Sequence, residues 1–195
     1  MRIKFFTAAL FAMAIMAGTT STFAQGKMKK NDNTEKTVMV GGAAMYPTKN
    51  IVENAVNSKD HTTLVAAVKA ADLVETLQSA GPFTVFAPTN MAFGKLPKGT
   101  VETLLMPENK TKLQTILTYH VVAGNHSASD IMKDIKKGNG KVMYKTVSGG
   151  TLTAMMKGKK VMLMDENGGM AAVTIADVNQ SNGVIHVIDG VVLPK

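Results

Sequence analysis

The segment from residue 81 to residue 93 is Gly81-Pro82-Phe83-Thr84-Val85-Phe86-Ala87-Pro88-Thr89-Asn90-Met91-Ala92-Phe93. Its first half has the apolar composition of a buried strand, which Pro88 ends because proline lacks a backbone N–H. Thr89 can then cap a short helix. Burying each of its large apolar side chains stabilises the fold by roughly 1.5–3 kcal/mol. The segment therefore predicts a strand and a short helix at the core.

The apolar pattern differs on the two sides of this segment. From Asn50 to Gly81 apolar residues recur at spacings of three and four, which is typical of helices, and Asp60 is predicted to cap the second helix. Two more helices are expected before residues 119–122, and another from Ser127 to Lys137. Beyond Gly138 five short β-type runs alternate with turn residues, at 142–147, 151–156, 161–165, 171–178 and 184–188. The pattern predicts an α+β domain.

Two further segments, together with residues 81–93, carry a resemblance to a known family. Tyr119-His120-Val121-Val122-Ala123-Gly124 stands mid-chain, and Asn182-Gly183-Val184-Ile185-His186-Val187-Ile188-Asp189-Gly190-Val191-Val192-Leu193-Pro194 lies at the end. With residues 81–93 they resemble the signature segments of fasciclin domains, in that family's order and at its usual separation. The resemblance runs from about Asn50 to Lys195. It implies a single fasciclin-like domain, with a helical N-terminal half packed on a wedge of β-strands, and a role in extracellular adhesion without catalytic residues or cofactors.

Most of the signature residues are interpreted as structural. They are Phe83, Thr84, Phe86, Pro88, Thr89, Asn90, Phe93, Asn182, Gly183, His186, Asp189 and Gly190. Tyr119 and His120 leave two interpretations open. The resemblance associates their segment with recognition of cell-surface receptors. A histidine within an apolar run, however, is more often a buried, neutral, hydrogen-bonded group.

The first 24 residues have the layout of a secretory signal peptide. Arg2 and Lys4 precede an apolar run of 13 residues, and Thr22-Phe23-Ala24 provides small residues for cleavage after Ala24. A membrane span would need about 20 apolar residues. The predicted organisation is a signal peptide at 1–24, a flexible basic linker at 25–46 and a fasciclin-like domain at 47–195. We expect a secreted or periplasmic protein without a membrane span after cleavage.

Basic charge is concentrated late in the chain. The segment from Lys133 to Lys160 contains eight lysines and a single acidic residue, Asp134. The whole chain has a net charge of +8. Lys157, Lys159 and Lys160 are candidates for binding an anionic polysaccharide or a cell-surface or matrix protein, because clustered charge accelerates association. The alternative is that these lysines keep exposed hairpins soluble and protect strand edges. Nucleic acid is not an expected partner of an exported protein with 5% aromatic residues.

No pattern of catalytic or metal-binding residues occurs in the sequence. The four histidines lie far apart without metal-ligand spacing, and cysteine is absent. Neither a nucleophile elbow nor a phosphate-binding glycine loop occurs. We also expect most of the 15 methionines to fill the core. The sequence thus predicts a non-catalytic, exported adhesion or binding module without cofactor or metal; the alternative is an envelope structural protein without a specific ligand.

Overall fold

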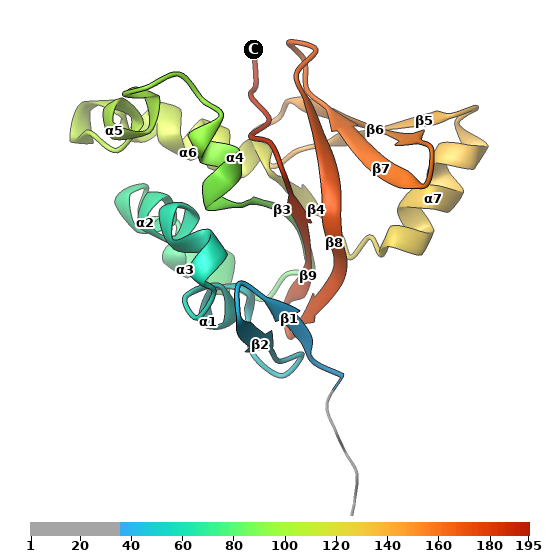
Figure 1. Ribbon diagram of the computed structural model, residues 1–195, viewed down its shortest axis with the longest axis horizontal. Helices are drawn as coiled ribbons and strands as arrows, with labels where there is room; N and C mark the ends of the chain where they lie inside the picture. The colour runs from blue at the N-terminus through green and yellow to red at the C-terminus, as the bar shows by residue number, and fades with distance from the viewer. Residues whose placement is uncertain (1–35) are drawn as a thin grey trace, which may run out of the picture. The chain divides into compact units, whose positions relative to one another are not determined.

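The computed structural model describes residues 36–195 (Figure 1). The predicted signal peptide, and the linker before residue 36, lie outside the described residues. The helices are α1 (Ile51–Ala55), α2 (Thr62–Ala70), α3 (Val74–Gln78), α4 (Asn90–Gly94), α5 (Thr100–Leu104), α6 (Lys110–Tyr119) and α7 (Ala128–Lys137), with 3₁₀ turns at Lys59–His61 and Pro107–Asn109. The strands are β1 (Val38–Val40), β2 (Ala43–Met45), β3 (Phe83–Pro88), β4 (Val121–Ala123), β5 (Lys141–Lys145), β6 (Thr151–Lys157), β7 (Lys160–Met164), β8 (Met170–Gln180) and β9 (Gly183–Ile188).

Seven strands form one mixed sheet in the order β4-β3-β9-β8-β7-β6-β5. All neighbours are antiparallel except β3 and β9, which are parallel and so bring the first and last signature segments side by side. The register of β8 against β9 shifts on both sides of Ile175. Such irregularities bend a strand and increase its twist. Strand β8 therefore links the half of the sheet around β3 and β9 to the half formed by β5–β7.

The helices cover the two halves of the sheet differently. Helices α1–α6 lie on the side of β3 and β9, whereas α7 lies beside β5–β7 (Figure 1). A core cluster joins Ile131 and Ile135 of α7 to Leu152, Leu163 and other inward residues of the sheet. A second cluster packs the N-terminal hairpin and α1 on β3 and β9, and a third joins α2, α5 and α6. The predicted α+β fold, with a helical first half packed on strands, is confirmed.

The end of the predicted linker is part of the fold. Strands β1 and β2 form a hairpin within residues 38–45. Val40 and Met45 are 5% and 3% exposed, and both belong to the core cluster on β3 and β9. The linker prediction for residues 25–46 is therefore wrong over this hairpin, which was missed because its few apolar residues alternate over only three positions per strand.

Two other expectations are wrong. Asp60 does not cap a helix; it lies inside the 3₁₀ turn Lys59–His61, and α2 has no side-chain cap from its own N-terminal residues. Most of the described methionines do not fill the core either, although Met45 belongs to it and Met156 packs against it. Of the methionines within residues 36–195 only Met45 is buried, and the others are partly or largely exposed.

Candidate functional site

Tyr119 and His120 lie at the end of α6 and are both buried, at 0% and 3% exposure. The Tyr119 hydroxyl donates to the carbonyl of Thr151 at 2.6 Å, and burial raises its pKa to about 12. His120 Nδ1 donates to the Ile116 carbonyl at 2.8 Å, and Nε2 accepts from the Val192 N–H at 3.3 Å. Burial lowers the pKa of His120 to about 4. The imidazole is therefore neutral and ties α6 to the C-terminal segment.

The other signature residues also lie inside or against the core. Buried are Thr84, Phe86, Pro88, Gly183 and His186, and half-buried are Phe83, Thr89, Asn90, Phe93, Asn182, Asp189 and Gly190.

Phe86 and His186 connect the first and last signature segments directly. Their rings stack with centroids 5.7 Å apart, and the two residues are partners in the β3–β9 register. His186 Nδ1 accepts from the Asp177 N–H at 3.3 Å, and Nε2 donates to the His126 carbonyl at 2.9 Å. Burial lowers the pKa of His186 as well. Nearby, the Thr84 hydroxyl donates to the Gly124 carbonyl at 2.7 Å. The polar groups of these side chains are therefore occupied by hydrogen bonds within the fold.

Asn90 follows Thr89, which caps its own helix α4 by accepting from the Ala92 N–H at 3.2 Å. The Asn90 side chain instead reaches α2. Its oxygen accepts from the Thr63 N–H at 3.0 Å, and its nitrogen donates to the Lys59 carbonyl at 2.9 Å. Asn90 thus performs the capping role that the sequence assigned to Asp60.

Asn182 acts in the same way on two other helices. Its oxygen accepts from the Ile51 N–H at the start of α1 at 3.1 Å, and its nitrogen donates to the carbonyls of Leu77 and Ser79 at the end of α3.

A side chain at Gly183 would place its Cβ 2.0 Å from the Phe83 carbonyl oxygen, so only glycine fits between β9 and β3. Asp189 accepts from the Ala172 N–H at 2.7 Å and fixes β9 against β8.

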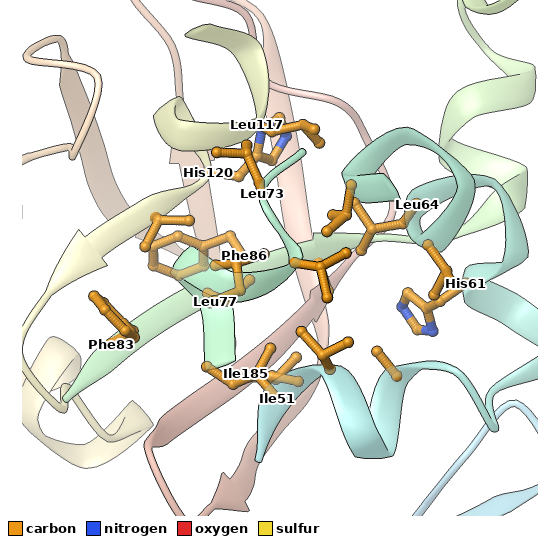
Figure 2. Close-up of a pocket in the computed structure, with 18 of the residues that line it drawn as sticks. Ile51, His61, Leu64, Leu73, Leu77, Phe83, Phe86, Leu117, His120 and Ile185 are labelled. Carbon is orange, nitrogen blue, oxygen red and sulfur yellow. The ribbon is translucent and has the colours of Figure 1, made fainter. Parts of the chain in front are cut away.

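An apolar cavity of about 90 Å³ lies between α1–α3 and strands β3 and β9 (Figure 2). His61, which the sequence did not single out, lines this cavity and is 3% exposed. Its Nδ1 is hydrogen-bonded to Ser58 Oγ at 2.9 Å. Its Nε2 has no hydrogen-bond partner among the described residues. Burial lowers the pKa of His61, and the Ala87 carbonyl partly offsets this effect. The cavity has room for a few carbon atoms. His120 and Lys69 also line it, but both ring nitrogens of His120 are engaged with backbone groups, and no carboxylate lines the cavity.

The candidate lysines Lys157, Lys159 and Lys160 are exposed at the turn between β6 and β7. None of them forms an ion pair with a described residue. By contrast, Lys133 and Lys137 on α7 lie 3.1 Å and 3.9 Å from Asp130 and Asp134. The lysine-rich region therefore has a helix whose charges are partly paired and a turn whose charges are not.

The described residues contain neither a metal-binding cluster of acidic, histidine or cysteine side chains nor a helix that could span a membrane. Between residues 36 and 195 no group of three His, Cys, Asp or Glu side chains could hold a metal ion. In the same part of the chain, every helix is too short or too polar to cross a bilayer.

Comparison with known proteins agrees with this architecture. The family model for the fasciclin domain matches residues 59–194. The chain belongs to the fasciclin domain family. Protein sll1483 of Synechocystis sp. is 51% identical over 167 residues, which are 86% of each chain. The cell surface glycolipoprotein MPB83 of Mycobacterium bovis is 35% identical over 160 residues, or 80% of this chain and 64% of that protein.

A solved structure confirms the fold. The FAS1 domain pair from the insect cell adhesion molecule Fasciclin I superposes with a TM-score of 0.67 at 19% identity, and the match covers 76% of this chain and 52% of that pair. The fasciclin fold explains why the three signature segments meet: two are paired as β3 and β9, and the third leads into β4 on the other side of β3.

Proposed function

We propose that this fasciclin protein is an exported, non-catalytic binding module that attaches to anionic components of cell surfaces or extracellular matrix through its β6–β7 turn. The observation that carries the proposal is the cluster of Lys157, Lys159 and Lys160, exposed and without an acidic partner among residues 36–195. The polysaccharides of such surfaces present repeated carboxylates or sulfates, which a turn of three lysines can contact together.

The register of the β6–β7 hairpin places two lysines side by side, which favours the binding of an anion. Lys157 and Lys160 are directly opposite each other at the end of the β6–β7 pairing. Like charges at this position repel and destabilise the pair, by an amount within the roughly 0.2–1 kcal/mol that cross-strand pairs contribute. An anionic partner removes that repulsion. Since a single exposed ion pair contributes about 0–1 kcal/mol, the three lysines must act together.

Protection of a strand edge explains other lysines better than it explains these. Strand β5 is the last strand of the sheet, and it carries the exposed Lys141 and Lys145. Lysines on an edge strand discourage pairing with another chain. Strands β6 and β7 have neighbours on each side, but the pairing with β5 ends at Met155 and the pairing with β8 ends at Met162. Lys157 and Lys160 therefore lie on a short two-stranded tip beyond the rest of the sheet, which offers another chain far fewer free backbone groups than β5 does.

The remaining support comes from the site and from the relatives. Tyr119, His120 and His186 are engaged in hydrogen bonds within the fold, so their chemistry is committed to structure. MPB83 is named a cell surface protein, and the related domain pair comes from a cell adhesion molecule. Export of this chain is supported by the pattern of residues 1–24.

The test is binding to heparin, used as an acidic polysaccharide, across a salt series. Lys157→Gln, Lys159→Gln and Lys160→Gln are combined in one variant. The matched control carries Lys133→Gln, Lys136→Gln and Lys137→Gln on α7, which is the same change in charge. Binding by the native protein should weaken steeply with salt, because the Debye length falls from about 10 Å at 0.1 M to about 3 Å at 1 M.

We expect the turn variant to bind several-fold more weakly and the α7 variant to bind nearly as the native protein does. Equal loss in both variants would indicate net charge alone. Binding that is independent of salt and of both sets of substitutions would favour the alternative, an envelope protein without a specific ligand.

A further inference from the structure

Five methionines gather on one face of the β5–β8 part of the sheet. Met155 is the register partner of Met162, and Met164 is the partner of Met170. Met162 and Met164 are two residues apart on β7, so they point to the same face. Met143 on β5 lies opposite Thr153. Thr153 is two residues from Met155 on β6, so Met143 lies on the same face of the sheet. The four residues Met155, Met162, Met164 and Met170 therefore form a contiguous group, which we call the methionine face.

The methionine face is open to solvent. The alternate residues of these strands, among them Leu152, Ala154 and Leu163, point the other way into the core cluster with α7. The Tyr144 hydroxyl donates to Asp134 of α7 at 3.2 Å, which places the helix on that opposite side. Within the methionine face Met170 is 46% exposed, and Met155, Met162 and Met164 are partly exposed. The neighbouring Met143 is 68% exposed.

Neither folding nor solubility accounts for methionine at these positions. Strand surfaces favour β-branched and aromatic residues, and methionine is not among them. Exposed apolar side chains also promote association, so a solvent-facing sheet usually carries polar residues. What methionine adds is its thioether, a polarisable sulfur on a flexible chain.

The geometry suits the binding of a soft metal ion. Directly opposed side chains have Cβ atoms about 4.5–5.5 Å apart, and three rotatable bonds allow each methionine to move its sulfur toward a shared position. Thioether sulfur is a soft ligand that selects Cu(I) over harder ions. The chain has no cysteine, so thioethers are its strongest soft ligands.

The surrounding charges limit the site to part of the methionine face. Lys141 is opposite Met155, and Lys157 and Lys160 lie two residues beyond Met155 and Met162. These ammonium groups repel a cation, by about 1 kcal/mol at 4 Å in water, and less when salt screens them. Met164 and Met170 are farther along the strands from these three lysines. We propose that Met162, Met164 and Met170, with Met155 at the margin, bind one soft monovalent cation, Cu(I) or its redox-stable analogue Ag(I).

The test uses silver nitrate added to the purified protein in chloride-free buffer. The protein is labelled with ¹³C at its methionine methyl groups, so that NMR reports each thioether separately. We expect the resonances of the methionine face to shift together with a stoichiometry near one ion. The isolated, exposed Met91, which is 81% exposed, provides an internal control and should shift only at a large excess of silver.

Variants decide whether the grouping matters. Met162→Leu with Met164→Leu conserves volume, and such exchanges usually cost less than about 1.5 kcal/mol. It should weaken Ag(I) binding by about tenfold or more. The matched control, Met91→Leu with Met132→Leu, removes two thioethers from separate helices and should bind as the native protein does. Competition with a chromophoric Cu(I) chelator should rank the Cu(I) affinities of the native protein and the two variants in the same order.

Three results would overturn the proposal. The first is the absence of any shift at the methionine face, as expected if it docks another protein or only absorbs oxidants. The second is an equal response from every exposed methionine. The third is unchanged affinity in the Met162→Leu, Met164→Leu variant while circular dichroism shows that it is folded. None of these readouts depends on heparin binding by the β6–β7 turn.

Discussion

His61, His120 and His186 are buried, and burial lowers the pKa of each one. In His120 and His186 both ring nitrogens have backbone partners, and the direction of each bond selects one neutral tautomer. Two signature segments thus use histidine as a neutral two-ended connector between chain segments. This role needs one donor and one acceptor on a rigid ring, which neither a carboxylate nor an amide of the same size provides in that geometry.

Replacing His120 tests its structural role. His120→Ala removes the bonds to Ile116 and Val192 and leaves a cavity, so we expect the free energy of unfolding to fall by about 1–3 kcal/mol. Thermal and urea unfolding measure this change. Heparin binding of the folded variant should remain, because the β6–β7 turn is intact. A melt identical to that of the native protein, combined with lost binding to cells or matrix, would instead assign His120 to recognition.

Acid should destabilise the domain before its carboxylates are protonated. A histidine with a lowered pKa in the folded state binds a proton more readily when unfolded, so stability falls as pH decreases through this window. For His120 the window extends from about 6.5 in the unfolded chain to about 4 in the folded one. Urea midpoints at pH 7.5 and pH 5.0 measure the effect. We expect a lower midpoint at pH 5.0 and a smaller difference in His120→Gln; equal midpoints would contradict burial of neutral histidines.

At the scale of elements, the sequence predicted the strands and turns that are determined by neighbouring residues, but not the contacts made by residues far apart in the chain. The strands after Gly138 were placed within about two residues because β-type runs and glycine turns coincide there. The cap of α2 could not be predicted, since it comes from Asn90, about 28 residues further along the chain. The methionine face was missed for a related reason: strand periodicity shows which residues share a face, but not which face the core covers.

The N-terminal hairpin gives a direct test of where the domain begins. Met45→Ala empties a buried position and should lower the free energy of unfolding by about 2–5 kcal/mol. Met39→Ala makes the same substitution on β1, where the side chain is 59% exposed, and should change it by less than about 0.5 kcal/mol. Chemical unfolding of both variants provides the comparison. If both are neutral, residues 38–45 behave as the predicted linker and not as part of the fold.

At the scale of the molecule, the chain separates structural from interactive chemistry. Its hydrogen-bonding signature residues hold the helices α1, α2, α3 and α6 and the C-terminal segment around β3 and β9. The unpaired lysines of the turn and the methionine face both lie in the β5–β8 part of the sheet, where the helix α7 covers only one side. Binding functions can therefore vary there without disturbing the family's core contacts.

Export is the property of the whole chain on which the proposed attachment to cell surfaces or matrix depends. The pattern from Arg2 to Ala24 predicts that the exported protein begins at Gln25, which lowers its net charge from +8 to +6 by removing Arg2 and Lys4. Intact-mass measurement of protein recovered outside the cytoplasm decides this. Ala24→Arg should block cleavage, because the peptidase requires a small residue before the cut, whereas the control Thr20→Ala should be processed normally. Recovery of a chain that retains residues 1–24 would instead indicate a membrane-tethered protein, whose turn could bind only partners within reach of that membrane.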